Sequence, residues 1–120
     1  MSQMNIEVVD HDGVKLLRLK GELAGEGRSR LVDAVTDLLS TPNKGLILDL
    51  GGVTYVNSAG LGDLVRMVAQ ANVQETQVVL TNLSSYLTGV LETTRLNRFF
   101  DVCPTSEDAL RRLGLSLIHI

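Results

Sequence analysis

The chain has 120 residues, of which 44% are apolar and 21% are charged, and its formal net charge is −3. This length suggests one domain with a single hydrophobic core, and the apolar content excludes wholesale disorder. The acidic balance, the absence of tryptophan and the small number of aromatic residues (two tyrosines and two phenylalanines) argue against nucleic-acid binding, which needs basic patches and stacking side chains.

The composition also bears on the compartment and on cofactors. The apolar runs are far shorter than the ~20 residues that cross a bilayer, and the N-terminus has no charged-then-apolar leader. We therefore expect a cytoplasmic protein without membrane insertion. Cys103 is the only cysteine, which excludes an internal disulfide, and we interpret it as a small hydrophobe near a strand end. His11 and His119 lie at opposite ends of the chain, so we expect no metal and no cofactor.

The first part of the chain predicts two strands and one helix. Residues 5–9 partly alternate as in a half-buried strand, residues 10–13 form a polar turn that ends in glycine, and residues 14–20 form the second strand of a hairpin. Residues 21–27 contain three glycines and predict a glycine-rich loop. A helix is then expected over residues 28–39, where apolar residues recur at three- and four-residue spacing.

The second part begins with an apolar run over residues 46–50, which predicts a central strand that is covered on both faces. Gly51-Gly52 predicts a turn, residues 53–56 predict a short β-rich piece, and a helix is expected to follow at Ser58. The remaining elements, in chain order, are expected to be a strand at residues 77–80, a helix marked by residues 83–91, a strand at residues 99–102 and a helix that is capped by Thr105 or Ser106.

The helix at Ser58 has one apolar stripe, which consists of Leu61, Leu64, Val65, Val68 and Ala71. Asp63 and Arg66 fall outside this stripe. Strands that alternate with helices predict the α/β class, with a mixed sheet of about four or five strands and about four helices packed on it. We expect one domain over residues 1–114 and a short apolar tail over residues 115–120.

The most informative stretch is residues 45–62, GLILDLGGVTYVNSAGLG. It is expected to place the hydroxyl of Ser58 in a strand-to-helix loop, at the N-terminus of the helix. The N–H groups at a helix N-terminus point outward and its macrodipole is positive, so a phosphate on Ser58 would be tolerated there. The same residues are also explained by capping, since Asn57 or Ser58 would cap a helix well. The two interpretations are compatible, because a capping hydroxyl is also a surface hydroxyl.

Residues 57–62, NSAGLG, resemble the phosphoacceptor region of STAS domains, the anti-sigma-factor antagonists of bacteria, whose usual signature is aspartate, serine, a small residue and Gly-Leu-Gly. Residues 21–23 are similar to the family's Gly-Glu-Leu-Asp turn, and residues 82–100 are similar to its last helix-loop-strand. The resemblance implies a single STAS-like domain that is phosphorylated on Ser58. It implies a partner-binding surface at Glu22, Ala24, Asn57, Ser58, Ala59, Gly60, Leu61 and Gly62.

Gly60 and Gly62 have two equally good explanations. Glycine in a first helical turn costs about 1 kcal/mol of helix stability, so its presence needs a reason. Small residues allow another backbone to approach closely, and both partner docking and tight packing on the sheet require this. Leu61, which lies between the two glycines, is expected to be a core residue more than a contact residue.

The resemblance implies function by partner switching. The unmodified protein would bind an anti-sigma factor that is also a serine kinase, and this binding would release a sigma factor for transcription. Phosphorylation of Ser58 would turn binding off, and a phosphatase would restore it. The oligomeric state stays open.

Two departures from the family pattern favour an alternative. Asn57 stands where most phosphorylatable members carry aspartate, and Ala24 stands where the family's Gly-Glu-Leu motif usually continues with aspartate. Glu22 and Glu26 remain nearby and could partly supply the negative charge. If the aspartate helps a kinase to activate the serine, phosphorylation here should be slow or absent. The alternative is a constitutive STAS interaction module, such as a subunit of a transporter or a signalling complex.

An intrinsic enzymatic activity is not expected. Residue 56 is valine, so Ser58 does not stand in a Gly-x-Ser-x-Gly elbow, and neither His11 nor His119 has a credible route to it. Residues 21–27 lack the Gly-Lys-Ser/Thr ending of a phosphate-binding loop. Any ATP chemistry would belong to a partner kinase, and a third interpretation, a small-molecule-binding module, depends on this glycine-rich loop alone.

Overall fold

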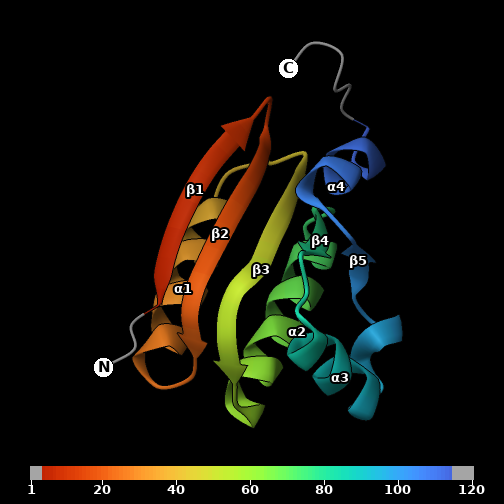
Figure 1. Ribbon diagram of the computed structural model, residues 1–120. Helices are drawn as coiled ribbons and strands as arrows, with labels where there is room; N and C mark the ends of the chain where they lie inside the picture. The colour runs from red at the N-terminus through yellow and green to blue at the C-terminus, as the bar shows by residue number, and fades with distance from the viewer. Residues whose placement is uncertain (1–3, 115–120) are drawn as a thin grey trace.

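Five strands form one mixed sheet in the computed structural model of the protein, which describes residues 4–114 (Figure 1). The strands, in their order both along the chain and across the sheet, are β1 (Asn5–His11), β2 (Val14–Leu23), β3 (Gly45–Val56), β4 (Gln77–Thr81) and β5 (Asp101–Cys103). β1 pairs with β2 in an antiparallel hairpin, and all later neighbours are parallel. The tail expected at residues 115–120 lies outside the described residues.

Helices cover both faces of this sheet; all but the last of them connect parallel strands, and the last follows β5 (Figure 1). They are α1 (Glu26–Leu39), α2 (Ser58–Val73), α3 (Ser85–Thr93) and α4 (Ser106–Arg112), with a short 3-10 helix, η1, at Leu96–Arg98. The apolar faces of α1, α2 and α3 share the larger core with one face of the sheet. The smaller core on the other face lies under α4. The predicted α/β class and mixed sheet are therefore confirmed.

The central strands show why their apolar residues are nearly continuous. Along β3, Leu46, Leu48 and Leu50 enter the larger core, whereas Ile47 enters the smaller one. Successive side chains of a strand point to opposite faces, so a strand covered on both faces needs apolar residues at nearly every position. Cys103 is buried in the smaller core at the end of β5, as predicted, and burial raises the pKa of its thiol.

The predicted turn at Gly51-Gly52 is wrong, because β3 runs without interruption from Gly45 to Val56. The register explains the two glycines. Arg18 of β2 lies opposite Asp49, whereas Lys20 lies opposite Gly52, so the ladder contains a β-bulge at this point. A Cβ on Gly52 would stand 2.7 Å from the carbonyl oxygen of Leu19, so the close approach of the two backbones requires glycine there.

The predicted glycine-rich loop over residues 21–27 is also wrong for most of its length. β2 continues to Leu23 and α1 begins at Glu26, which leaves only two residues between the strand and the helix. A Cβ on Gly27 would stand 2.2 Å from the carbonyl oxygen of Glu22, so this glycine allows the strand to pass directly into the helix. The interpretation as a small-molecule-binding module depended on a glycine-rich loop over residues 21–27, and the structure has strand and helix over most of these residues.

None of the helices within residues 4–114 has both the length and the apolar character needed to cross a membrane.

Candidate functional site

The site expected around Ser58 lies where two parallel strands end side by side. Leu23, the last residue of β2, pairs with Val56, the last residue of β3. The backbone N–H of Asn57 donates a hydrogen bond to the carbonyl oxygen of Leu23 at 3.4 Å. The structure thereby brings Glu22 to Ala24 next to the start of α2, although more than 30 residues separate these segments in the sequence.

Asn57 caps α2, which decides between the two capping residues that the sequence left open. Its backbone is extended, and its side-chain oxygen accepts a hydrogen bond from the N–H of Gly60 at 2.7 Å. Ser58 is then the first residue of the helix and is exposed. Its hydroxyl makes no hydrogen bond to any residue within 4–114. The hydroxyl is therefore accessible, and no hydrogen bond within residues 4–114 depends on it.

The two glycines of the first turns differ in their surroundings. A Cβ on Gly60 would stand 2.2 Å from the carbonyl oxygen of Leu23 and 2.9 Å from the Cγ of Leu23, so the packing of α2 against β2 requires glycine at this position. A Cβ on Gly62 would meet nothing closer than the guanidinium of Arg66, at 3.4 Å. The fold therefore explains Gly60 but leaves Gly62 without a packing reason.

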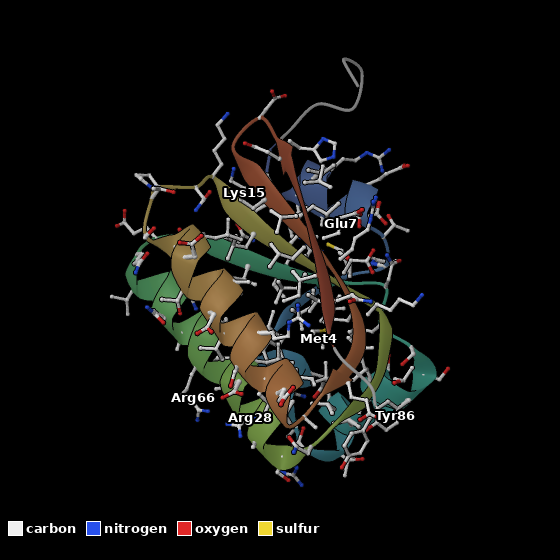
Figure 2. All side chains as sticks on the ribbon, turned by 90° about the vertical axis from the view of Figure 1, so that its left-hand side faces the viewer. Met4, Glu7, Lys15, Arg28, Arg66 and Tyr86 are labelled. Atoms are coloured by element: carbon white, nitrogen blue, oxygen red, sulfur yellow. The ribbon has the colours of Figure 1, made fainter. Side chains whose placement is uncertain are left out.

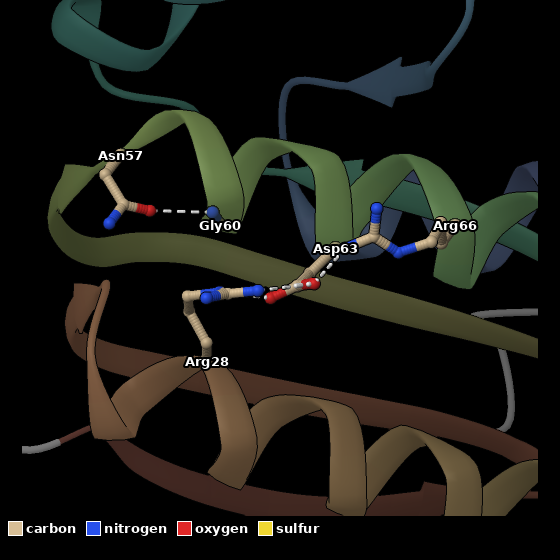
Figure 3. A network of polar contacts seen from close by, with 5 residues as sticks. All are labelled: Arg28, Asn57, Gly60, Asp63 and Arg66. Atoms are coloured by element: carbon tan, nitrogen blue, oxygen red, sulfur yellow. Dashed lines mark hydrogen bonds and ion pairs between the residues drawn. The ribbon is translucent and has the colours of Figure 1, made fainter.

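An ion-pair network joins α1 to α2 beside this turn (Figure 3). Arg28 of α1 donates through Nε to one carboxylate oxygen of Asp63 at 2.7 Å and through Nη2 to the other at 3.3 Å. Arg66, on the turn of α2 that follows Asp63, also donates to this carboxylate. The hydrogen bonds from Arg28, followed by those from Arg66, hold the pKa of the Asp63 carboxyl below its usual range, against the effect of burial.

Asp63 lies outside the apolar stripe of α2 in the sequence, and this position does not indicate that it is buried. The side chain of Asp63 is 6% exposed because Arg28 reaches over it from the neighbouring helix. A carboxylate is buried in this way only when cations satisfy its oxygens, and here two arginines do so. No local pattern in the sequence indicates a pair of residues 35 positions apart.

Two exposed tyrosines border the same end of the sheet, and the sequence analysis gave them no role. The hydroxyl of Tyr86, near the start of α3, accepts from the Val56 N–H at 3.2 Å and donates to the Val56 carbonyl at 3.3 Å. Tyr86 is 42% exposed, and Tyr55, which pairs with Glu22 across the strands, is 45% exposed. Figure 2 shows Tyr86, Arg28 and Arg66 at the same end of the molecule. In a chain with only four aromatic residues, the available signal was Tyr55, which stands three residues before Ser58.

The predicted partner-binding residues gather on this end of the sheet but differ in exposure. Ser58 is exposed and Gly60 is buried. The half-buried members of the set are Glu22, Ala24, Asn57, Ala59, Leu61 and Gly62. Leu61 packs at the margin of the larger core, in agreement with its expected role. Because Gly60 is buried, its role is to position α2 against β2.

Comparison with known proteins gives a consistent result. An anti-sigma factor antagonist from Mycobacterium paratuberculosis is 25% identical, with a TM-score of 0.84 over 92% of this chain and 94% of that one. A putative anti-sigma factor antagonist from Thermotoga maritima is 19% identical, with a TM-score of 0.81 over 92% and 95% of the two chains. A sulfate transporter family protein from Wolinella succinogenes is 19% identical, with a TM-score of 0.73 over 93% of each chain.

The last two likenesses concern the fold alone. The family assignment comes from the sequence model of the STAS domain, which matches residues 5–109, from the first strand to the middle of α4. This match spans the sheet, the end of β2 and the whole of α2. The chain therefore belongs to the STAS domain family.

Proposed function

We propose that the protein is an anti-sigma factor antagonist that acts by partner switching, through binding and not through catalysis. In its unmodified form it binds an anti-sigma factor that is also a serine kinase, and so releases a sigma factor. Transfer of a phosphoryl group from ATP to Ser58 ends this binding, and a phosphatase restores it. The observation that carries the proposal is the exposed hydroxyl of Ser58, which no residue within 4–114 engages, at the position of the family's phosphorylated serine.

A switch at this position needs no change of fold. Phosphorylation adds about −1.5 to −2 charges, and the N-terminus of α2 is an environment that favours negative charge. The helix is held by contacts that do not involve Ser58, namely the Asn57 cap, the packing of Gly60 on Leu23 and the pair of Arg28 with Asp63. A partner surface placed against Ser58 would, in contrast, meet new bulk and charge, so its affinity would fall.

The surroundings of Ser58 support a protein partner. Tyr55 and Tyr86 expose large amphipathic side chains at the end of β3 that leads into Ser58, and tyrosine is enriched in protein–protein interfaces. Ala59 and Gly62 add small residues that allow a partner backbone to approach. The likeness to the antagonist from Mycobacterium paratuberculosis supports the same class of partner.

The test is a set of parallel pull-downs from native lysate with wild type, Ser58→Asp and Ser58→Ala as baits, read by mass spectrometry. We expect wild type and Ser58→Ala to capture an ATP-binding kinase that Ser58→Asp does not. The control is Ser106→Asp, because Ser106 is the first residue of α4 on the other face of the sheet. Equal capture by all four baits would refute the switch, and melting temperatures within a few degrees of wild type would show that the variants are folded.

A constitutive interaction module is the second candidate, and a specific observation favours it. The residues Asn57 and Ala24 replace the aspartates that the family motifs usually carry at these positions, and one similar structure is that of a sulfate transporter family protein. The two candidates differ in one measurable outcome. Incubation with family kinases and ATP, followed by mass spectrometry, should add one phosphate on Ser58 under the switch hypothesis and none under the constitutive one.

A further inference from the structure

We propose that Arg66 is the internal receptor of the phosphate on Ser58, so that the modified serine is bound by the same helix that carries it. The inference rests on the proposed function, because it takes Ser58 as the modified residue. It goes further in naming the residue that responds to the modification, which neither the family motif nor the sequence pattern indicated.

The positions of three residues along α2 bring Arg66 toward Ser58. Ser58, Gly62 and Arg66 are spaced by four residues, so they follow one another on the same face of the helix. Side chains on a helix lean toward its N-terminus, which directs Arg66 back over Gly62 and toward Ser58. The coordinates agree, because a Cβ on residue 62 would stand 3.4 Å from Nη1 and 3.8 Å from Nη2 of Arg66.

Side chains four residues apart on a helix have Cβ atoms about 5–6 Å apart. The guanidinium of Arg66 already lies at the level of residue 62, so it is only one helical turn from Ser58. Residue 62 has no side chain between Ser58 and this guanidinium, so the Arg66 side chain can extend along the helix face toward a phosphate on the Ser58 hydroxyl. This gives Gly62 the reason that the packing of the fold does not provide.

The ion-pair network contains two arginines and one aspartate, so it carries one positive charge in excess. Arg66 is the more exposed cation, since its side chain is 69% exposed whereas that of Arg28 is 37% exposed. When Arg66 turns toward a phosphate, Arg28 keeps both of its hydrogen bonds to Asp63, so the buried carboxylate is not left without a partner. The exchange therefore replaces one charge-assisted contact of Arg66 by another.

The consequence concerns the surface that a partner meets. Before modification, the N-terminal part of α2 presents a neutral hydroxyl, with the exposed guanidinium of Arg66 about one helical turn away. After modification, the same end shows a phosphate with Arg66 drawn across it, so both the charge and the position of this cation change. Binding would be switched off by two local changes on one helix face, without movement of the backbone.

The experiment is a 31P NMR titration of protein in which phosphoserine is installed at position 58 by genetic encoding, so that no kinase is needed. A neighbouring cation favours the dianion, so Arg66 should lower the second pKa of the phosphate from its ordinary value of about 6. We expect Arg66→Gln to raise this pKa by roughly half a unit or more, and Arg66→Lys to give an intermediate value. Gly62→Leu, which keeps the arginine but fills the gap, should also raise it.

The matched control is Arg111→Gln. Arg111 is exposed and pairs with the aspartate three residues before it, as Arg66 does, but it lies on α4 over the opposite face of the sheet. A pKa that rises in Arg66→Gln but not in Arg111→Gln supports the inference. The same pKa in wild type and Arg66→Gln, or an equal rise in both variants, overturns it. This readout involves no partner, so a failed pull-down would refute the proposed function and leave this result unaffected.

Discussion

Alanine substitutions at Gly60 and Gly62 should have opposite effects on stability, although the residues lie two positions apart in one helix. The new Cβ at position 60 would stand 2.2 Å from the Leu23 carbonyl oxygen, whereas a normal carbon–oxygen contact is about 3.3 Å or longer. α2 would have to move by about 1 Å from a backbone that is itself held in the sheet, and overpacking of this kind costs about 1–3 kcal/mol.

At position 62 the balance is reversed. The new Cβ would stand 3.4 Å from the end of a flexible arginine, which is an ordinary contact. Replacement of glycine by alanine inside a helix then contributes about 0.5–1 kcal/mol of stability. We expect the two variants to differ by about 2–3 kcal/mol in the free energy of unfolding, which corresponds to about 10 °C in melting temperature for a domain of this size.

Thermal and urea unfolding of both variants, followed by far-UV circular dichroism because the chain has no tryptophan, measures this difference. Wild type and Gly89→Ala provide the references, since Gly89 lies inside α3 and a Cβ there meets nothing within 4 Å. We expect Gly89→Ala and Gly62→Ala to be similar. A Gly60→Ala protein as stable as Gly62→Ala would refute the close approach of α2 to Leu23 and, with it, the separation of roles between the two glycines.

Three further outcomes follow from the contacts of the site and the core. The pKa of Asp63 is lowered in the fold, so its contribution to stability is present above about pH 4, its unfolded value, and is lost as the pH falls through the folded value. Asp63→Asn should therefore lose less stability than wild type between pH 7 and pH 3, and equal losses in urea titrations would contradict this. Asn57→Ala should lower the free energy of unfolding by about 1 kcal/mol because the Gly60 N–H loses its acceptor. Asn57→Asp should raise it by about 0.3–1 kcal/mol, because a negative charge is favoured at a helix N-terminus. Unchanged melting temperatures of both variants would exclude the cap. The buried Cys103 should react with a thiol reagent at least about a hundredfold more slowly in the native state than in urea, and equal rates would show that it is accessible.

Local patterns predicted the features of this fold that depend on neighbours in the chain. The apolar run in β3 indicated a strand covered on both faces, and the two cores on its sides explain that pattern. The position of Ser58 at a helix start also followed from the adjacent sequence. The cap of α4 was narrowed to Thr105 or Ser106, and the structure shows that it is Thr105. In each case the physical cause acts within a few residues, through alternation of side chains or through a capping hydrogen bond.

The features that were missed depend on segments that are distant in the sequence. Gly52 was expected in a turn and Gly27 in a loop. In the structure Gly52 allows a close approach to the Leu19 backbone, and Gly27 allows one to the Glu22 backbone. The same holds for Asp63, whose burial depends on an arginine of another helix. Glycine and aspartate are ordinary turn and surface residues by local preference, so only the tertiary structure reveals these roles.

The contacts that hold α2 and the residues available for signalling are separate sets, and this separation has a mechanistic consequence. The Asn57 cap, Gly60 on Leu23 and the pair of Arg28 with Asp63 position the helix. Ser58 contributes to none of these contacts, and the remaining bond of Arg66 to Asp63 is one that the network can lose without leaving the carboxylate unpaired. A change of charge at Ser58 can therefore alter the surface within one helical turn while the free energy of unfolding stays nearly constant. A large change in the free energy of unfolding on phosphorylation would mean that these two sets overlap. The response to phosphorylation would then include a movement of the α2 backbone.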